Sequence, residues 1–224
     1  MQSSKTFLFD LNGTMIDDMD YHTKAWHHIL NEDLGGNFSW EEVKNNMYGK
    51  NPEVLVRLFG AERFTNDEMN KISIEKETRY QQAFFPQLRL LPGLAEFLQL
   101  AYEHKIKMAI GSAAIPYNIN FVLDNLHIRH YFDAIVSADD VKMSKPDPET
   151  FSMAAALLKA DPAYCIVFED APKGVEAALN ADMDCVVITT VHEKKSFKDY
   201  PNVIAFIKDF TDPFCKQLIV GYKV

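Results

Sequence analysis

The sequence predicts an α/β protein: a parallel sheet covered by helices on both faces, with a second, all-helical domain inserted into it. Two observations predict this fold class. Short unbroken apolar runs alternate with amphipathic helical patterns over much of the 224-residue chain, as in buried parallel strands that helices cover. After the first run, by contrast, residues 17–81 carry almost only helical patterns, which indicates an insertion.

The apolar runs place the strands and the spacing of apolar residues places the helices. The predicted strands are Thr6–Phe9, Lys107–Ile110, Ala134–Ser137, Cys165–Phe168, Cys185–Ile188 and Val203–Phe206. Predicted helices of the same domain lie around Phe97, Ile119, Phe151 and Val175. The alternation describes a Rossmann-like, doubly wound parallel sheet, and we expect the tail Asp209–Val224 to cover one of its edges.

Residues 17–81 are too many for an ordinary strand-to-helix connection. Four segments of this stretch are compatible with helices: Tyr21–Leu30, Trp40–Met47, Pro52–Phe59 and Asp67–Tyr80. Pro92 and Gly93 then break the pattern before the next helix of the sheet domain. We therefore predict a core domain formed by residues 1–16 and 82–224, and a helical cap domain formed by residues 17–81.

Composition and charge restrict the class of protein. The formal net charge of −9 argues against a nucleic-acid partner but leaves room for a small phosphorylated substrate. Cys165, Cys185 and Cys215 lack the spacing of a disulfide framework or zinc site, so we expect reduced thiols. With no signal-peptide pattern, no apolar run near the ~20 residues of a membrane span and no large apolar helix seam, we expect a cytoplasmic monomer without membrane contact.

Polar residues follow four of the predicted strands. Asp10 follows the first, Ser112 lies after the second, Lys145 lies in the loop after the third, and Glu169-Asp170 follow the fourth. Singly, these residues are what turns, solvated loops and helix N-termini contain. Together they are expected at one edge, because the carboxyl ends of parallel strands meet there and bind ligands.

The chemistry of this set is that of phosphoryl transfer. Asp10 and Asp170 offer oxygen ligands to Mg²⁺, and Glu169 could orient one of its waters. The Asp10 carboxylate could accept a phosphoryl group as an aspartyl-phosphate. Lys145, the Ser112 hydroxyl and backbone N–H groups of the Gly13-Thr14 turn could hold the remaining phosphoryl oxygens.

These motifs, in this order, resemble those of the haloacid dehalogenase superfamily of phosphotransferases. Asp10–Thr14 is similar to its first motif, and Ser112, Lys145 and Glu169-Asp170 are similar to the other three. The resemblance implies a helical cap, an Asp10 nucleophile, and Mg²⁺ bound by Asp10, the Asn12 carbonyl, Glu169 and Asp170. It also implies that Thr14 and Ala113 contact the substrate.

Within the superfamily, the β-phosphoglucomutase-like branch is the most similar. His22 and Trp26 resemble its segment at the cap entrance, where the histidine aligns the substrate, and Lys76 resembles its phosphate-contacting cap lysine. The alternatives are structural. His22 and Trp26 lie four residues apart and would be neighbours on a packed helix face. Lys76 lies among Glu75, Glu77 and Arg79, as a residue of a solvated face would.

Two positions depart from the branch. The mutases carry an arginine for the distal phosphate where this chain has Pro52, although Lys50 could substitute. Asn12 replaces the aspartate that protonates the leaving group, and its loss is expected to lower turnover roughly 10²–10⁴-fold while metal and phosphate still bind. An engineered substitution, a natural low-activity member and a binding protein are all compatible with Asn12, and Asp17 is a candidate substitute acid.

From the residues and the resemblance we expect a Mg²⁺-dependent phosphatase for a small phosphate ester, specifically a sugar phosphate, slowed by Asn12. The alternatives are a β-phosphoglucomutase and a non-catalytic protein that binds a phosphorylated ligand. The sequence leaves the physiological substrate open.

Overall fold

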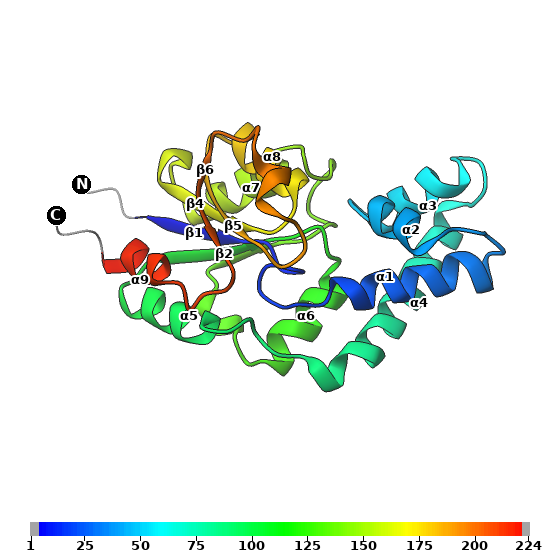
Figure 1. Ribbon diagram of the computed structural model, residues 1–224, viewed down its shortest axis with the longest axis horizontal. Coiled ribbons are helices and arrows are strands. Elements are labelled where there is room, and N and C mark those ends of the chain that lie inside the picture. Colours follow the sequence, from blue (N-terminus) through cyan, green and yellow to red (C-terminus); the bar gives the residue numbers. More distant parts are fainter. Residues whose placement is uncertain (1–4, 221–224) are drawn as a thin grey trace. The chain divides into compact units, whose positions relative to one another are not determined.

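A computed structural model describes residues 5–220 and contains a six-stranded parallel sheet with the strand order β3-β2-β1-β4-β5-β6 (Figure 1). The strands are β1 Thr6–Phe9, β2 Lys107–Gly111, β3 Ala134–Val136, β4 Cys165–Glu169, β5 Asp184–Ile188 and β6 Val203–Ile207. All six predicted strands are confirmed, and each observed end lies within one residue of the predicted one. The predicted α/β fold class is confirmed.

Helices cover both faces of this sheet. They are α5 Leu94–Glu103, α6 Pro116–Asn125, α7 Glu149–Leu158, α8 Pro172–Asn180 and α9 Pro213–Val220. In β1, Leu8 packs into a cluster with side chains of α7 and α8, while Phe7 and Phe9 contact Phe97 of α5. Side chains of one strand alternate between the two faces, so the sheet is doubly wound as predicted.

The tail lies differently from our expectation. The Phe210 ring contacts Phe9, Phe97 and Phe168, with ring centroids 6.4, 5.4 and 5.6 Å apart. Phe9 and Phe168 belong to the central strands β1 and β4, so this part of the tail covers a face of the sheet, and the predicted edge position is wrong for it. The last part of the predicted tail, residues 221–224, is outside the described residues.

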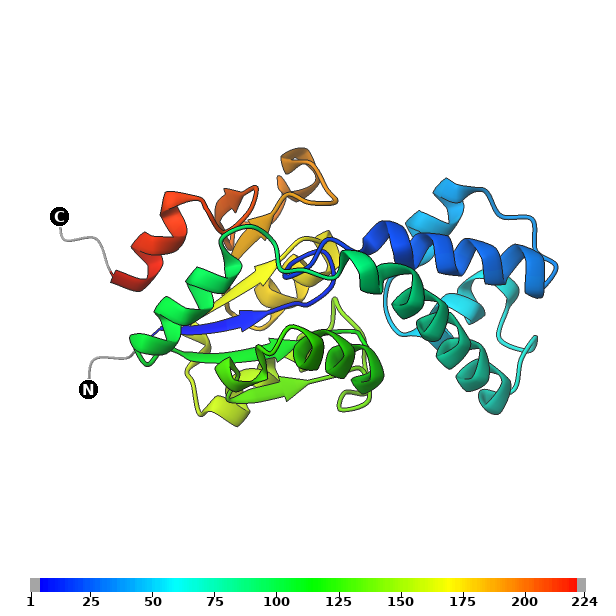
Figure 2. The same ribbon diagram turned by 90° about the horizontal axis from the view of Figure 1, so that it is seen from below.

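The inserted residues form a compact unit of their own, Asp18–Leu88, which we call the helical unit. Its helices are α1 Met19–His28, continued by the π-helix Ile29–Asp33, then α2 Trp40–Asn46, α3 Asn51–Phe59, α4 Asn66–Phe84 and a 3₁₀ turn Phe85–Gln87. Figure 2 shows α1 and α4 side by side. Capping boxes at Ser39 and Thr65 start α2 and α4.

The unit ends later than residue 81, where we placed the boundary. Helix α4 continues to Phe84, and the buried Phe84 ring packs on Tyr21 and Tyr80 of the same unit. The remainder of the chain, through Asp17 and from Arg89 onward, forms the sheet unit. Within residues 5–220, none of the helices is both long enough and apolar enough to cross a membrane.

The strand order determines where polar residues meet. Strand β1 pairs with β2 on one side and β4 on the other, which makes β1 and β4 the point where the winding of the sheet reverses. Phe9 is aligned with Ile110 of β2 and Phe168 of β4. The residues that follow these three therefore emerge side by side at the carboxyl edge, where open α/β sheets bind ligands.

Candidate active site

Three carboxylates gather at the carboxyl ends of β1 and β4. Asp10, Glu169 and Asp170 are buried, with 8, 2 and 3% of their surface exposed, and each offers an oxygen within 4.8 Å of the others. The Asp10 N–H donates to the Phe168 carbonyl at 3.0 Å, which continues the pairing of β1 and β4 by one residue. Asp10 is therefore held by the sheet and not by a mobile loop.

Lys145, from the loop between β3 and α7, lies among these carboxylates. Its Nζ donates to Asp10 Oδ1 at 2.7 Å and to Glu169 Oε1 at 2.8 Å. The Phe151 ring lies below it, 4.4 Å from Nζ to the ring centroid. Burial alone would lower the pKa of Lys145, but the charges of Asp10 and Glu169 outweigh it and raise that pKa above its ordinary value. The ammonium therefore keeps its charge.

Glu169 is fixed from two sides. Its Oε2 accepts from the N–H groups of Asp170 and Ala171, both at 2.8 Å, at the N-terminus of α8, while Oε1 accepts from Lys145. A Cβ at position 174 would lie 1.6 Å from Glu169 Oε1. Only a glycine at 174 leaves space for the carboxylate in this position.

The turn after β1 is built around the Asp170 carboxylate. Gly13 has a φ of +77°, and a Cβ there would lie 2.4 Å from Asp170 Oδ2. The Thr14 hydroxyl donates to Asp170 Oδ1 at 3.0 Å. Asn12, half-buried, begins this turn and forms a β-bridge with Ile16. Asn-Gly suits such a turn, since both residues tolerate left-handed backbone conformations.

The donor set fits a hard divalent cation. With all three carboxylates ionised, the single ammonium of Lys145 would leave two negative charges in this buried cluster. Burial, and then the charges of Glu169 and Asp10, raise the pKa of Asp170 well above its ordinary value. A bound divalent cation would remove this penalty, and carboxylate and carbonyl oxygens are the ligands that Mg²⁺ prefers.

The predicted phosphate-binding residues of β2 lie at the same edge. Ser112 directly follows β2, and its N–H donates to the Val136 carbonyl of β3 at 3.0 Å. Its buried hydroxyl accepts from the Ala114 N–H at 3.1 Å, and Ala113 between them is half-buried. Ser112 is thereby held in a tight loop next to the end of β1.

In the helical unit, the structure brings three predicted residues together. Lys76 Nζ lies 2.8 Å from His22 Nδ1 and 5.4 Å from the centroid of the Trp26 ring. Only 3% of Lys76 is exposed, so the alternative of a solvated face is wrong for it. Lys50 lies directly before α3, next to Asn51.

Sequence reasoning missed several partners of His22 and Lys76. Lys76 Nζ also donates to Glu77 Oε1 at 2.8 Å, and Asn51 Nδ2 donates to the same oxygen at 2.7 Å. His22 Nε2 lies 3.3 Å from Asp18 Oδ2 and its ring stacks on Tyr80 at 3.7 Å, while the Tyr80 hydroxyl donates to the same Asp18 oxygen at 2.5 Å. We call this set the helical-unit cluster: Asp18, His22, Asn51, Lys76, Glu77 and Tyr80.

The cluster places each ring nitrogen of His22 beside a polar group. Lys76 is a donor only, so His22 Nδ1 accepts in this contact, while Nε2 faces Asp18 Oδ2. Burial alone would raise the pKa of Glu77, but the Lys76 charge and hydrogen bonds lower it to about 2. The four-residue spacings of Asp18 with His22 and of Lys76 with Tyr80 are the sequence signals that could have indicated shared helix faces.

The sequence matches the family described as haloacid dehalogenase-like hydrolase over residues 7–188. The chain belongs to this family. The family expected from the motifs is thus confirmed, as is the prediction of an enzyme of the haloacid dehalogenase-like hydrolase type.

Relatives of this haloacid dehalogenase-like hydrolase include a sugar-phosphate phosphatase and a β-phosphoglucomutase. β-Phosphoglucomutase of Bacillus subtilis is 34% identical over 187 residues, which cover 81% of this chain and 82% of that protein. Fructose-1-phosphate phosphatase of Escherichia coli is 31% identical over 182 residues, covering 80 and 93%. The crystal structure of β-phosphoglucomutase from Clostridium difficile matches with a TM-score of 0.82 at 26% identity, covering 96% of this chain and 97% of that one.

Proposed function

We propose that this chain is a Mg²⁺-dependent phosphatase acting on a small phosphorylated metabolite, specifically a sugar phosphate. The observation that carries the proposal is the buried cluster of Asp10, Lys145, Glu169 and Asp170 at the point where the winding of the sheet reverses. It combines a fixed carboxylate nucleophile, a permanent positive charge and an excess of oxygen ligands. The phosphatase and mutase relatives, which act on phosphorylated sugars, support the substrate class.

In the proposed reaction, an Asp10 carboxylate oxygen forms a bond to phosphorus while the bond from phosphorus to the ester oxygen breaks. The leaving alkoxide takes up a proton and departs as the alcohol. Water then attacks the aspartyl-phosphate, which releases phosphate and restores Asp10. Lys145 holds Asp10 in place and balances charge on the phosphoryl oxygens, with Ser112 and the backbone around Thr14 and Ala113 as further contacts.

Mg²⁺ would supply neutralisation of the phosphoryl charge when bound. Asp10, Asp170 and the Asn12 carbonyl would hold it, with Glu169 completing the site through water. Asn12 offers no acidic side chain, so the departing alkoxide lacks a proton donor at this position. We therefore infer that turnover is lowered by roughly 10²–10⁴-fold. Binding of the metal and of phosphate should stay intact.

The Asn12→Asp substitution tests whether Asp10 is the nucleophile and whether Asn12 causes the slow turnover. Phosphate release from a panel of sugar phosphates should rise by roughly 10²–10⁴-fold in this variant, require Mg²⁺, and vanish in the D10A/N12D double variant. Activity that survives removal of the Asp10 carboxylate would refute the nucleophile. No gain from Asn12→Asp, with sugar-phosphate binding intact in calorimetry, would instead favour a non-catalytic binding protein, which the amide at position 12 makes the second candidate.

The mutase alternative is less well supported. A mutase must bind a bisphosphate in two orientations, and Pro52 stands where the mutases carry an arginine for the distal phosphate. A second phosphate would also need a free positive charge in the helical unit. There, Glu77 already pairs with Lys76 at 2.8 Å, and the low pKa of Glu77 keeps the Glu77 carboxylate charged. Supplied with β-glucose 1-phosphate and a trace of bisphosphate, N12D should release phosphate; accumulation of glucose 6-phosphate would identify a mutase.

A further inference from the structure

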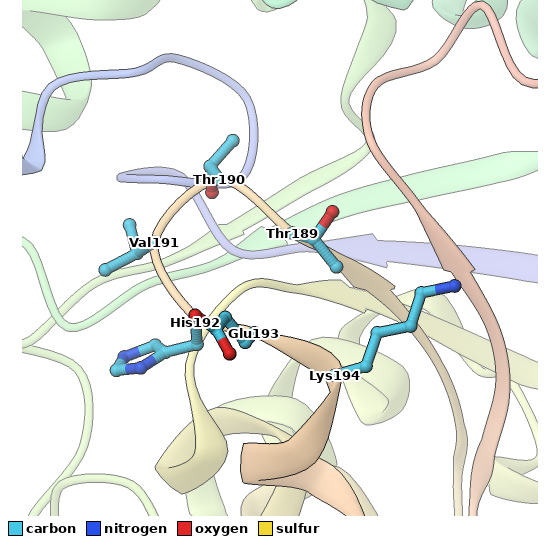
Figure 3. A pocket seen from close by; sticks show the side chains of 6 residues that line it. All are labelled: Thr189, Thr190, Val191, His192, Glu193 and Lys194. Carbon is cyan, nitrogen blue, oxygen red and sulfur yellow. The ribbon is translucent and has the colours of Figure 1, made fainter.

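The loop after β5 reaches the turn that follows Asp10. Residues Thr189–Lys194 line a shallow pocket of about 440 Å³ at the carboxyl edge of the sheet (Figure 3). The Thr190 hydroxyl donates to the Gly13 carbonyl at 2.6 Å, a contact between residues 177 positions apart. Figure 3 shows Thr190 beside the segment that follows β1. Thr190 lies outside the four motifs that follow β1, β2, β3 and β4.

The direction of the Gly13 carbonyl affects two parts of the proposed site. The peptide unit between Gly13 and Thr14 is planar and trans, so the direction of the Gly13 carbonyl sets the opposite direction of the Thr14 N–H. That N–H is among the donors proposed above for the phosphoryl oxygens. Gly13 also packs against Asp170, and the Thr14 hydroxyl donates to Asp170. A rotation of this peptide would therefore disturb both the phosphoryl contact and a metal ligand.

We propose that Thr190 is a positioning residue that fixes the Gly13–Thr14 peptide for phosphoryl binding. The proposal rests on the proposed function, because the turn has this task only if the site binds a phosphoryl group. The alternative is that Thr190 merely satisfies a carbonyl and stabilises the fold. The neighbouring Thr189 allows the two to be separated, because its hydroxyl also donates to a carbonyl, that of Ile207 in β6, at 3.2 Å.

The experiment compares Thr190→Val, which removes the hydroxyl at nearly constant volume, with Thr190→Ser, which retains it, and with Thr189→Val as the matched control. Thr190→Ala serves if the valine variant does not fold. Calorimetry measures the affinity for inorganic phosphate in the presence of Mg²⁺. Hydrogen exchange of the peptide spanning residues 11–16 reports the stability of the turn directly, and melting curves report the stability of the fold.

Losing this one hydrogen bond should weaken phosphate binding by roughly threefold to tenfold. Thr190→Val should also speed exchange in residues 11–16, while Thr190→Ser and Thr189→Val stay within about twofold of the parent chain in both readouts. Equal effects of Thr190→Val and Thr189→Val would overturn the proposal. A parent chain that binds no phosphate would refute the proposed function, and unchanged exchange in Thr190→Val would separately refute the role of Thr190.

Discussion

Replacing Gly174 with alanine should destabilise the sheet unit, although a glycine-to-alanine replacement stabilises most helices. Gly174 lies in the first turn of α8, and glycine-to-alanine replacement inside a helix usually gains about 0.5–1 kcal/mol. Here the new Cβ would lie 1.6 Å from Glu169 Oε1 and 1.9 Å from its Cδ. Two atoms cannot share this space, so the Glu169 carboxylate must leave its position.

The cost follows from the contacts that Glu169 makes. Its displacement breaks hydrogen bonds from the Asp170 and Ala171 N–H groups and the one from Lys145. Each hydrogen bond to a charged group contributes about 1.5–3 kcal/mol, and water restores part of the loss because the released carboxylate moves outward. After subtracting the helix gain, we expect a net loss of about 2–4 kcal/mol in the free energy of unfolding.

Urea unfolding of G174A at fixed Mg²⁺ concentration measures this change. The control is the same replacement in an E169A background, where the carboxylate is absent and the new methyl group has room. There the alanine should stabilise by about 0.5–1 kcal/mol, so the sign reverses between the two backgrounds. A stabilising G174A in the otherwise unchanged chain would refute the reasoning, since it would show that Glu169 needs no glycine at 174.

Three further predictions concern the proposed metal site and the helical unit. Gly13→Ala should weaken Mg²⁺ binding at least tenfold by calorimetry, because its Cβ would displace the Asp170 carboxylate; unchanged affinity would contradict the fit between Gly13 and Asp170. Mg²⁺ at about 100 times its dissociation constant should stabilise the chain by about 2.7 kcal/mol, and Asp170→Asn should abolish this shift in melting experiments. Glu77 has a pKa of about 2 in the fold against an ordinary 4.5, so its contribution is complete above pH 4.5 and is lost as the pH falls toward 2. Glu77→Gln should flatten that acid dependence by up to about 3 kcal/mol, and superimposable acid-unfolding profiles would rule out the lowered pKa.

The sheet was predictable because apolar runs record burial on both faces. Phe7, Leu8 and Phe9 were predicted to form a buried strand, and in the structure they do. Their strand ends where the polar residues begin. The proximity of Asp10, Glu169 and Asp170 followed from one geometric rule, that the carboxyl ends of parallel strands share an edge.

The helical-unit cluster could not be read in the same way. Its members come from different helices, and a charged residue such as Glu77 looks solvated in a periodic pattern even when 3% of it is exposed. Lys76 therefore remained undecided until its contacts were known. Thr190 carried no local signal at all, because its partner is 177 residues away. The boundary at residue 81 missed the aromatic contacts of Phe84, which hold the last turn of α4 in the helical unit.

The long sequence separation of the site contacts has a consequence for synthesis of the chain. The hydrogen bonds that join Asp10 to Lys145, Thr14 to Asp170 and Gly13 to Thr190 span 135, 156 and 177 residues. On the ribosome, Asp10 is synthesised 135 residues before Lys145, the earliest of these partners in the chain. A nascent chain that stops before the fifth strand would carry Asp10 without the loop that holds its turn. The three contacts are therefore complete only after the segment that contains Thr190 has been synthesised.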